Sequence, residues 1–86
     1  MAFGKGSLRF YTTTVQDTII ERARIDPAGN LGIGTQIPKS KLHVTEGDIF
    51  IEDVNRGVIM QSPDGNHWRF TVDNNGLMVS TPVSIK

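Results

Sequence analysis

Turn-forming residues interrupt this chain roughly every ten residues, which limits any regular element to a short strand. Three interruptions share one chemistry: Asp26-Pro-Ala-Gly-Asn30, Pro63-Asp-Gly-Asn66 and Asp73-Asn-Asn-Gly76. In each, Pro or an Asx residue favours the bend, and Gly accepts the positive φ that the turn needs. We therefore expect hairpins at these positions rather than long helices.

The residues between the turns favour β-structure. Ile and Val number sixteen and Thr eight, whereas Leu numbers only four. Such β-branched side chains suit a pleated surface better than a helix. Residues 18–25 fit either a short helix with a capping box or an alternating strand, and the alternation favours the strand. The expected strands are residues 8–14, 18–25, 31–33, 42–44, 49–53, 58–61, 67–73 and 77–81.

Charge and composition argue against several classes of partner. Nine basic and nine acidic residues give a net charge of zero, so no basic excess is present to neutralise a row of phosphates. No apolar run approaches the ~20 residues that span a bilayer. Cysteine is absent, which excludes disulfides and thiolate metal sites. The sequence predicts a chain that binds neither nucleic acid nor the membrane interior.

No motif in the sequence specifies catalysis. Gly32-Ile33-Gly34 lacks the third glycine of a dinucleotide loop, and Pro38 prevents a following helix, so we interpret these glycines as architecture. The two histidines, His43 and His67, are isolated. Three copies of either could meet on a trimer axis and bind a metal, but a surface histidine is the more ordinary interpretation. We expect no catalytic residue, no metal and no cofactor.

Two sets of residues remain as candidates for structural or binding roles. Glycines at turns or close approaches form the first set: Gly29, Gly32, Gly34, Gly65 and Gly76. Aromatic and basic residues that could contact a sugar or protein receptor form the second: Tyr11, Trp68 and Arg69. Trp68 could instead anchor the core of the C-terminal hairpin, together with Phe70 and Val72.

The segment Glu21–Val44, ERARIDPAGNLGIGTQIPKSKLHV, closely resembles a motif of bacteriophage tail fibres and related trimeric appendages. The family form is approximately R-x-R-I-D-x-x-G-N-[VL]-G-I-G-T-x-x-P-x-x-K-L-x-V, and the match covers just over a quarter of the chain. A second stretch, GVIMQSPDGNHWRFTVDNNGLMVST, looks more loosely like the distal end of many phage fibres.

The resemblance implies a homotrimer in a virion appendage, either intertwined and fibre-like or built as a small β-sandwich or prism. It implies one trimeric β-domain over residues 1–86, with an attachment segment and first strand (1–20), the fibre motif (21–56) and a hairpin tip (57–86). Residues expected in the trimer core are Ile25, Leu31, Ile33, Leu42 and Val44.

The function implied is structural and non-enzymatic: a fibre or spike segment that serves host attachment. The alternative is a trimeric capsid-decoration protein on the viral shell. Expected partners are two further copies of the chain, other proteins of the tail or capsid, and a glycan or protein of the host surface. A tailspike depolymerase is disfavoured, because the chain is short for a long β-helix and no carboxylate pair stands out.

Overall fold

The computed structural model describes residues 6–85, in which the chain forms seven β-strands and no helix. The expected all-β fold class is therefore confirmed. The chain separates into two compact units, Met1–Asp48 (unit 1) and Ile49–Lys86 (unit 2). This boundary falls inside the segment assigned to the fibre motif, and a single trimeric domain stays a prediction. Residues 1–5 of the expected attachment segment lie outside the described residues.

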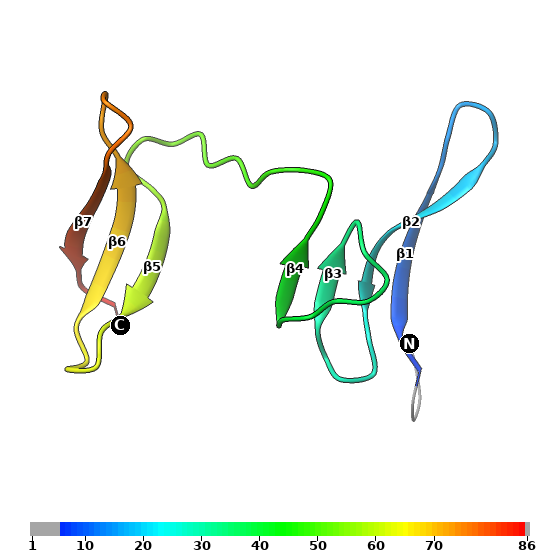
Figure 1. Cartoon of the computed structure of the whole chain (residues 1–86), viewed down its shortest axis with the longest axis horizontal. Helices are drawn as coiled ribbons and strands as arrows, with labels where there is room; N and C mark the ends of the chain where they lie inside the picture. Colours follow the sequence, from blue (N-terminus) through cyan, green and yellow to red (C-terminus); the bar gives the residue numbers. More distant parts are fainter. Residues whose placement is uncertain (1–5, 86) are drawn as a thin grey trace. The chain divides into compact units, whose positions relative to one another are not determined.

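Unit 1 contains one four-stranded sheet in the order β1-β2-β3-β4 (Figure 1). The strands are β1 (Leu8–Thr13), β2 (Ile19–Ile25), β3 (Leu31–Ile33) and β4 (Leu42–Val44). The first three are antiparallel neighbours, whereas β4 runs parallel to β3. Residues 18–25, which fitted a helix or a strand, thus lie mostly in a strand.

A β-bulge in β2 reassigns side chains between the two faces of this sheet. Phe10 pairs with Ala23 and the next residue, Tyr11, pairs with Glu21, so Arg22 is the extra residue. One extra residue reverses the alternation beyond it. Glu21 therefore faces the same side as Tyr11, and Arg22 donates from Nε to Thr12 Oγ1 at 2.6 Å on the opposite side.

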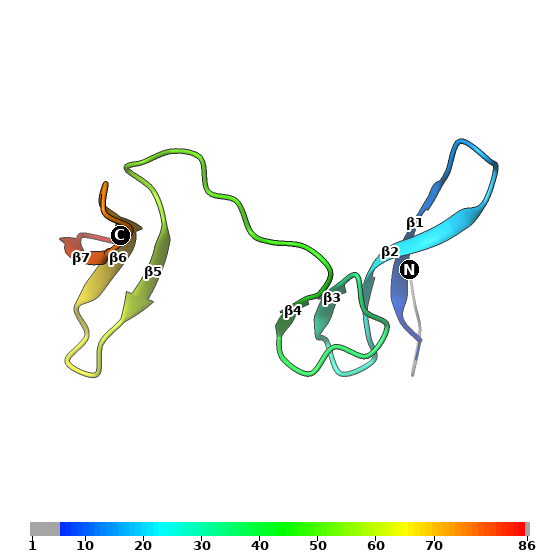
Figure 2. The same cartoon turned by 45° about the horizontal axis from the view of Figure 1, so that its top comes forward.

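The segment joining β3 to β4 crosses over one face of the sheet (Figure 2). Gly32 and Pro38 are buried where this segment meets β3. A Cβ added at Gly32 would lie 2.7 Å from the Thr35 carbonyl oxygen and 3.3 Å from the Pro38 Cβ. His43, on the same side, accepts a hydrogen bond at Nδ1 from the Lys39 backbone N–H at 3.1 Å. This face is therefore covered by the chain itself.

The opposite face of the sheet, which we call the apolar sheet face, is uncovered in the single chain. Strand pairing aligns Leu8 with Ile25, Ile25 with Leu31, and Leu31 with Leu42 on this side. Its members are Leu8, Phe10, Ala23, Ile25, Leu31, Ile33, Leu42 and Val44. Ile33 is 43% exposed, Phe10 49% and Leu42 52%. Among the described residues, only Gly32 and Pro38 are buried.

Unit 2 contains a three-stranded antiparallel meander in the order β5-β6-β7. The strands are β5 (Val58–Gln61), β6 (His67–Val72) and β7 (Met78–Val83). Pro82 lies in the edge strand β7 opposite Trp68, where a missing backbone donor is tolerated. One side of this sheet carries Val58, Met60, Trp68, Phe70, Val72 and Met78.

Four hairpins across the two units share one five-residue turn. Their ranges are Thr14–Thr18, Asp26–Asn30, Ser62–Asn66 and Asp73–Leu77. In each, the first N–H donates to the fifth carbonyl and the fourth N–H donates to the first carbonyl. The fourth residue has positive φ: Asp17 (63°), Gly29 (88°), Gly65 (95°) and Gly76 (79°). Three of the glycines expected in turns therefore occupy equivalent positions.

Asp17 is the exception in this set, because it holds a left-handed conformation without being glycine. An L side chain pays about 1–2 kcal/mol there, less for Asp than for most residues. We expect Asp17→Gly to raise the free energy of unfolding by about 0.5–1 kcal/mol. Denaturant unfolding followed by far-UV circular dichroism measures the change. Gln16→Gly, at the neighbouring position, should instead lower the free energy of unfolding. Equal changes for the two variants would contradict a stabilising effect specific to the positive φ of residue 17.

The expected strand 49–53 is wrong: these residues carry no strand pairing. Asp53 does begin a turn, accepting the Arg56 N–H at its carbonyl and the Asn55 N–H at Oδ1. However, the fourth position of this turn is Arg56, and the glycine comes one residue later, at Gly57. Without a residue suited to positive φ at the fourth position, the hairpin does not close. Residues 49–53 are therefore left without a partner strand.

Candidate functional site

The apolar sheet face is the strongest candidate site in unit 1. All five residues expected in the trimer core lie on it together: Ile25, Leu31, Ile33, Leu42 and Val44. Sequence reasoning missed Leu8, Phe10 and Ala23, which extend the same face onto β1 and β2. The alternation Leu8-Arg9-Phe10 was the available signal. A contiguous apolar face of this kind, open to water, is typical of a protein–protein contact.

A bidentate ion pair holds the covered face of the same sheet. Arg24 donates from Nε to Glu21 Oε2 and from Nη2 to Glu21 Oε1, both at 2.8 Å. The side chains of Arg24 and Glu21 are only 15% and 7% exposed. Arg24 Nη1 also donates to the Gln36 carbonyl at 3.2 Å, which ties the crossover segment to β2. The bulge at Arg22 makes the pair possible by placing both side chains on one face.

The hydrogen bonds from Arg24 lower the pKa of Glu21 below its ordinary value of 4.5, against partial desolvation, which raises it. Because the folded pKa is below the unfolded one, Glu21 contributes stability that is fully present above about pH 4.5 and is lost as the pH falls through the folded pKa. The crossover segment is therefore held most firmly at neutral pH.

We expect the melting temperature of the wild type to fall more steeply than that of Glu21→Gln as the pH is lowered from about 6 to about 3. The reason is that Glu21→Gln has no stabilising charge to lose. Thermal unfolding by circular dichroism at a series of pH values measures the difference. The control is Glu46→Gln, which removes an exposed carboxylate. The melting temperature of Glu46→Gln should depend on pH as steeply as that of the wild type. If it were as independent of pH as that of Glu21→Gln, the stabilising role assigned to Glu21 would be contradicted.

In unit 2, Trp68 is anchored to the turn that precedes it. Its Nε1 donates to Ser62 Oγ at 2.9 Å, and that hydroxyl also lies 2.6 Å from Asp64 Oδ1. The hydrogen bond from Ser62 lowers the pKa of Asp64, supported by the Asn66 backbone N–H. These contacts fit the interpretation of Trp68 as an anchor of the hairpin.

The residues expected to contact a receptor are divided between the two units. Trp68 and Arg69 are consecutive in β6 and therefore face opposite sides of the sheet. Tyr11 lies in β1 of unit 1, opposite Glu21. Each remains at a surface, since Tyr11 is 52% exposed and Trp68 and Arg69 are half-buried. Unit 2 therefore offers no combined aromatic and cationic surface built from Trp68 and Arg69.

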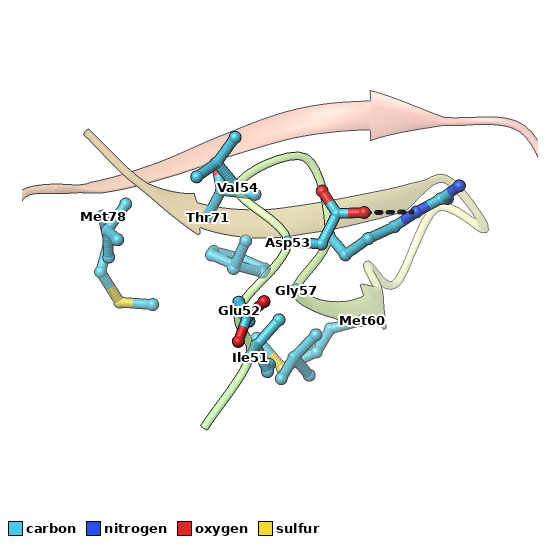
Figure 3. A pocket seen from close by; sticks show the side chains of 12 residues that line it. Ile51, Glu52, Asp53, Val54, Gly57, Met60, Thr71 and Met78 are labelled. Carbon is cyan, nitrogen blue, oxygen red and sulfur yellow. Dashed lines mark ion pairs between the residues drawn. The ribbon is translucent and has the colours of Figure 1, made fainter. Parts of the chain in front are cut away.

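A groove of about 460 Å³ lies on the apolar side of unit 2 (Figure 3). Its walls come from the segment before β5, from β5 itself, and from the ends of β6 and β7. Apolar side chains dominate the lining: Ile51, Val54, Val58, Met60, Phe70, Val72 and Met78. Glu52, Asp53 and Arg56 also line the groove, and Asp53 and Arg56 pair with each other at 3.9 Å. The lining suits an apolar side chain better than a charged ligand.

The space beside Gly32 and Gly34, where a side chain would begin, is taken up by atoms of the chain itself. A Cβ at Gly32 would lie 2.7 Å from the Thr35 carbonyl oxygen, and a Cβ at Gly34 would lie 2.6 Å from the Thr45 carbonyl oxygen. Carbonyl oxygens at both positions would repel a phosphate. Gly34 also has a φ of 81°, whereas Gly32 lies within β3 and is required for close approach alone.

Within residues 6–85, no three His, Asp or Glu side chains gather closely enough to hold a metal ion. In the same range, no helix is long and apolar enough to cross a membrane. No family model, curated protein or solved structure matches the chain.

Proposed function

We propose that this chain is the subunit of a homotrimeric structural protein of a bacteriophage virion, a fibre or spike segment that serves attachment to the host. The observation that carries the proposal is the apolar sheet face, which is continuous over four strands and uncovered in a single chain. The resemblance of residues 21–44 to trimeric phage fibres supports an assembly of three copies and its location in a phage virion.

The burial of side chains supports assembly. No Ala, Val, Ile, Leu, Met, Phe, Trp or Tyr among the described residues is buried in the single chain. Ordering the backbone costs about 1–2 kcal/mol per residue, and apolar burial is the main term that offsets it. Packing the apolar sheet faces of three copies together supplies that burial. Folding and assembly are then one process.

The residues of the fibre-like motif have physical roles that build this face. Asp26 Oδ1 accepts the Ala28 and Asn30 N–H groups, and Gly29 completes the turn from β2 to β3. Pro38 then packs on Gly32 and keeps the crossover on the covered side. The motif therefore specifies a sheet with one self-covered face and one face left for a partner.

Mass measurement in solution tests the proposal. Light scattering at micromolar concentration should give three times the 9.5 kDa chain mass. The melting temperature should rise with protein concentration when unfolding is reversible, because association and folding are linked. A folded species at the monomer mass, with a melting temperature independent of concentration, would refute the homotrimer.

A capsid-decoration protein is the second candidate, and one observation favours it. Trp68 and Arg69 face opposite sides of β6, so this pair forms no ready receptor surface in unit 2. Binding assays separate the two functions. A fibre or spike segment should adsorb to host cells and compete with phage adsorption, with avidity from three tips. A decoration protein should instead bind empty capsids and leave phage adsorption unchanged.

A further inference from the structure

The segment between Asp48 and Asp53 leaves large apolar side chains in water. Phe50 is 81% exposed and Ile49 is 67% exposed. The segment runs without a turn or bend, and the hydrogen bonds of the described residues include none from the backbone of 49–52. Side chains alternate along such a chain. Ile51 lines the groove of unit 2, whereas Phe50 does not.

We propose that the groove of unit 2 receives the Phe50 side chain of a second copy of this chain. The inference rests on the proposed homotrimer and deepens it, by assigning a second contact between copies. Because each copy carries one Phe50 and one groove, the contact passes from each copy to the next and closes under cyclic symmetry. The apolar lining and the methionines Met60 and Met78 suit an aromatic ring.

The size of the contact favours a second copy over an unrelated ligand. A buried aromatic side chain removes about 150–250 Å² from water, whereas a stable interface buries about 800 Å² per partner. The Phe50 contact is therefore too small to hold a free partner by itself. A copy already held through the apolar sheet face presents its Phe50 at high effective concentration.

Site-specific photo-crosslinking tests the proposal. The full chain is prepared with p-benzoylphenylalanine in place of Phe50, and isotopically light and heavy chains are unfolded together and refolded as a mixture. After irradiation, peptides containing Met60 or Met78 should carry cross-links to position 50, with both isotopes in one cross-linked pair. The control places the same amino acid at Val15, which is fully exposed in a hairpin turn of unit 1. It should give no such pairs.

A second measurement uses Phe50→Ser, which should leave the fold intact because the side chain is exposed in the single chain. On dilution, the trimer of this variant should dissociate at a protein concentration at least tenfold higher than the wild-type trimer does, and it should bind the apolar dye ANS where the wild-type trimer does not. Phe50→Leu should retain most of the affinity.

The outcomes separate this inference from the proposed function. A trimer whose position 50 cross-links only within its own chain, or whose groove binds ANS in the wild type, overturns the inference and leaves the homotrimer standing. A wild-type chain that is monomeric at every concentration overturns both.

Discussion

Ile33→Glu should abolish the trimer. Ile33 lies in β3 on the apolar sheet face, between Ala23 and Val44 on the neighbouring strands. In the single chain it is 43% exposed, so a carboxylate there stays in contact with water. In the proposed trimer the same carboxylate is buried without a partner in all three copies, which costs several kcal/mol for each. Association should weaken by at least about 1000-fold.

The matched control is Ile37→Glu, the same substitution in the crossover segment away from the apolar sheet face. Ile37 is 75% exposed, and its variant should keep the mass of the wild type. Sedimentation at several concentrations measures both variants. An Ile33→Glu protein that retains the wild-type mass would show that this face is not the contact between copies. Loss of the trimer in both variants would show that added charge alone is responsible.

The turns were the most predictable part of this fold, because their chemistry is local. Asp26 and Asp73 each accept two backbone N–H groups within four residues, and the glycine needed for positive φ stands at a fixed spacing after them. At Asp53 the glycine is displaced by a single residue to Gly57, and the turn that begins there closes no hairpin. A strand was expected for residues 49–53 from β-branched content alone, which says nothing about the partner that a strand needs.

The bulge at Arg22 could not be predicted from the sequence, since no local sequence pattern indicates an extra residue in a strand. In a regular strand, Glu21 and Arg24 would face opposite sides, and no ion pair would be expected. Because of the bulge, Glu21 faces the same side of the sheet as Arg24. The ion pair that they form then ties the crossover segment to the sheet. The apolar residues of β2, β3 and β4 were placed on one face because the fibre-like motif fixes their spacing. The contribution of β1 depends on the pairing of distant residues and was missed.

The same limit applies to the aromatic candidates. Tyr11, Trp68 and Arg69 were grouped by chemical type, and the sequence contains no information that would bring them together. The structure pairs Tyr11 with Glu21 and anchors Trp68 on Ser62, so each has a local role. The hydrogen bond from Trp68 to a turn hydroxyl could have been anticipated from the short spacing between them, six residues across one hairpin.

Gly57→Ala should unfold unit 2. A Cβ at Gly57 would overlap the Phe70 carbonyl oxygen, which belongs to the central strand β6 and cannot move without disturbing its ladder. Forcing a methyl group into such a contact costs about 3 kcal/mol. A domain of this size has only about 2–6 kcal/mol of stability in total, at roughly 0.05–0.15 kcal/mol per residue. The expected loss is therefore comparable to the whole stability of the unit.

Gly65→Ala is the matched comparison, because it separates conformational strain from overlap. Gly65 has a φ of 95° but open space around its Cβ position, so the same change should cost only about 1–2 kcal/mol. Trp68 is the single tryptophan of the chain and lies in unit 2, so its fluorescence during urea unfolding reports on this unit. Gly57 is not among the residues with positive φ, so a larger loss for Gly57→Ala than for Gly65→Ala can come only from its contact with Phe70. Equal midpoints for the two variants would mean that β5 can shift away from β6 at little cost, and the walls of the groove would then not be fixed.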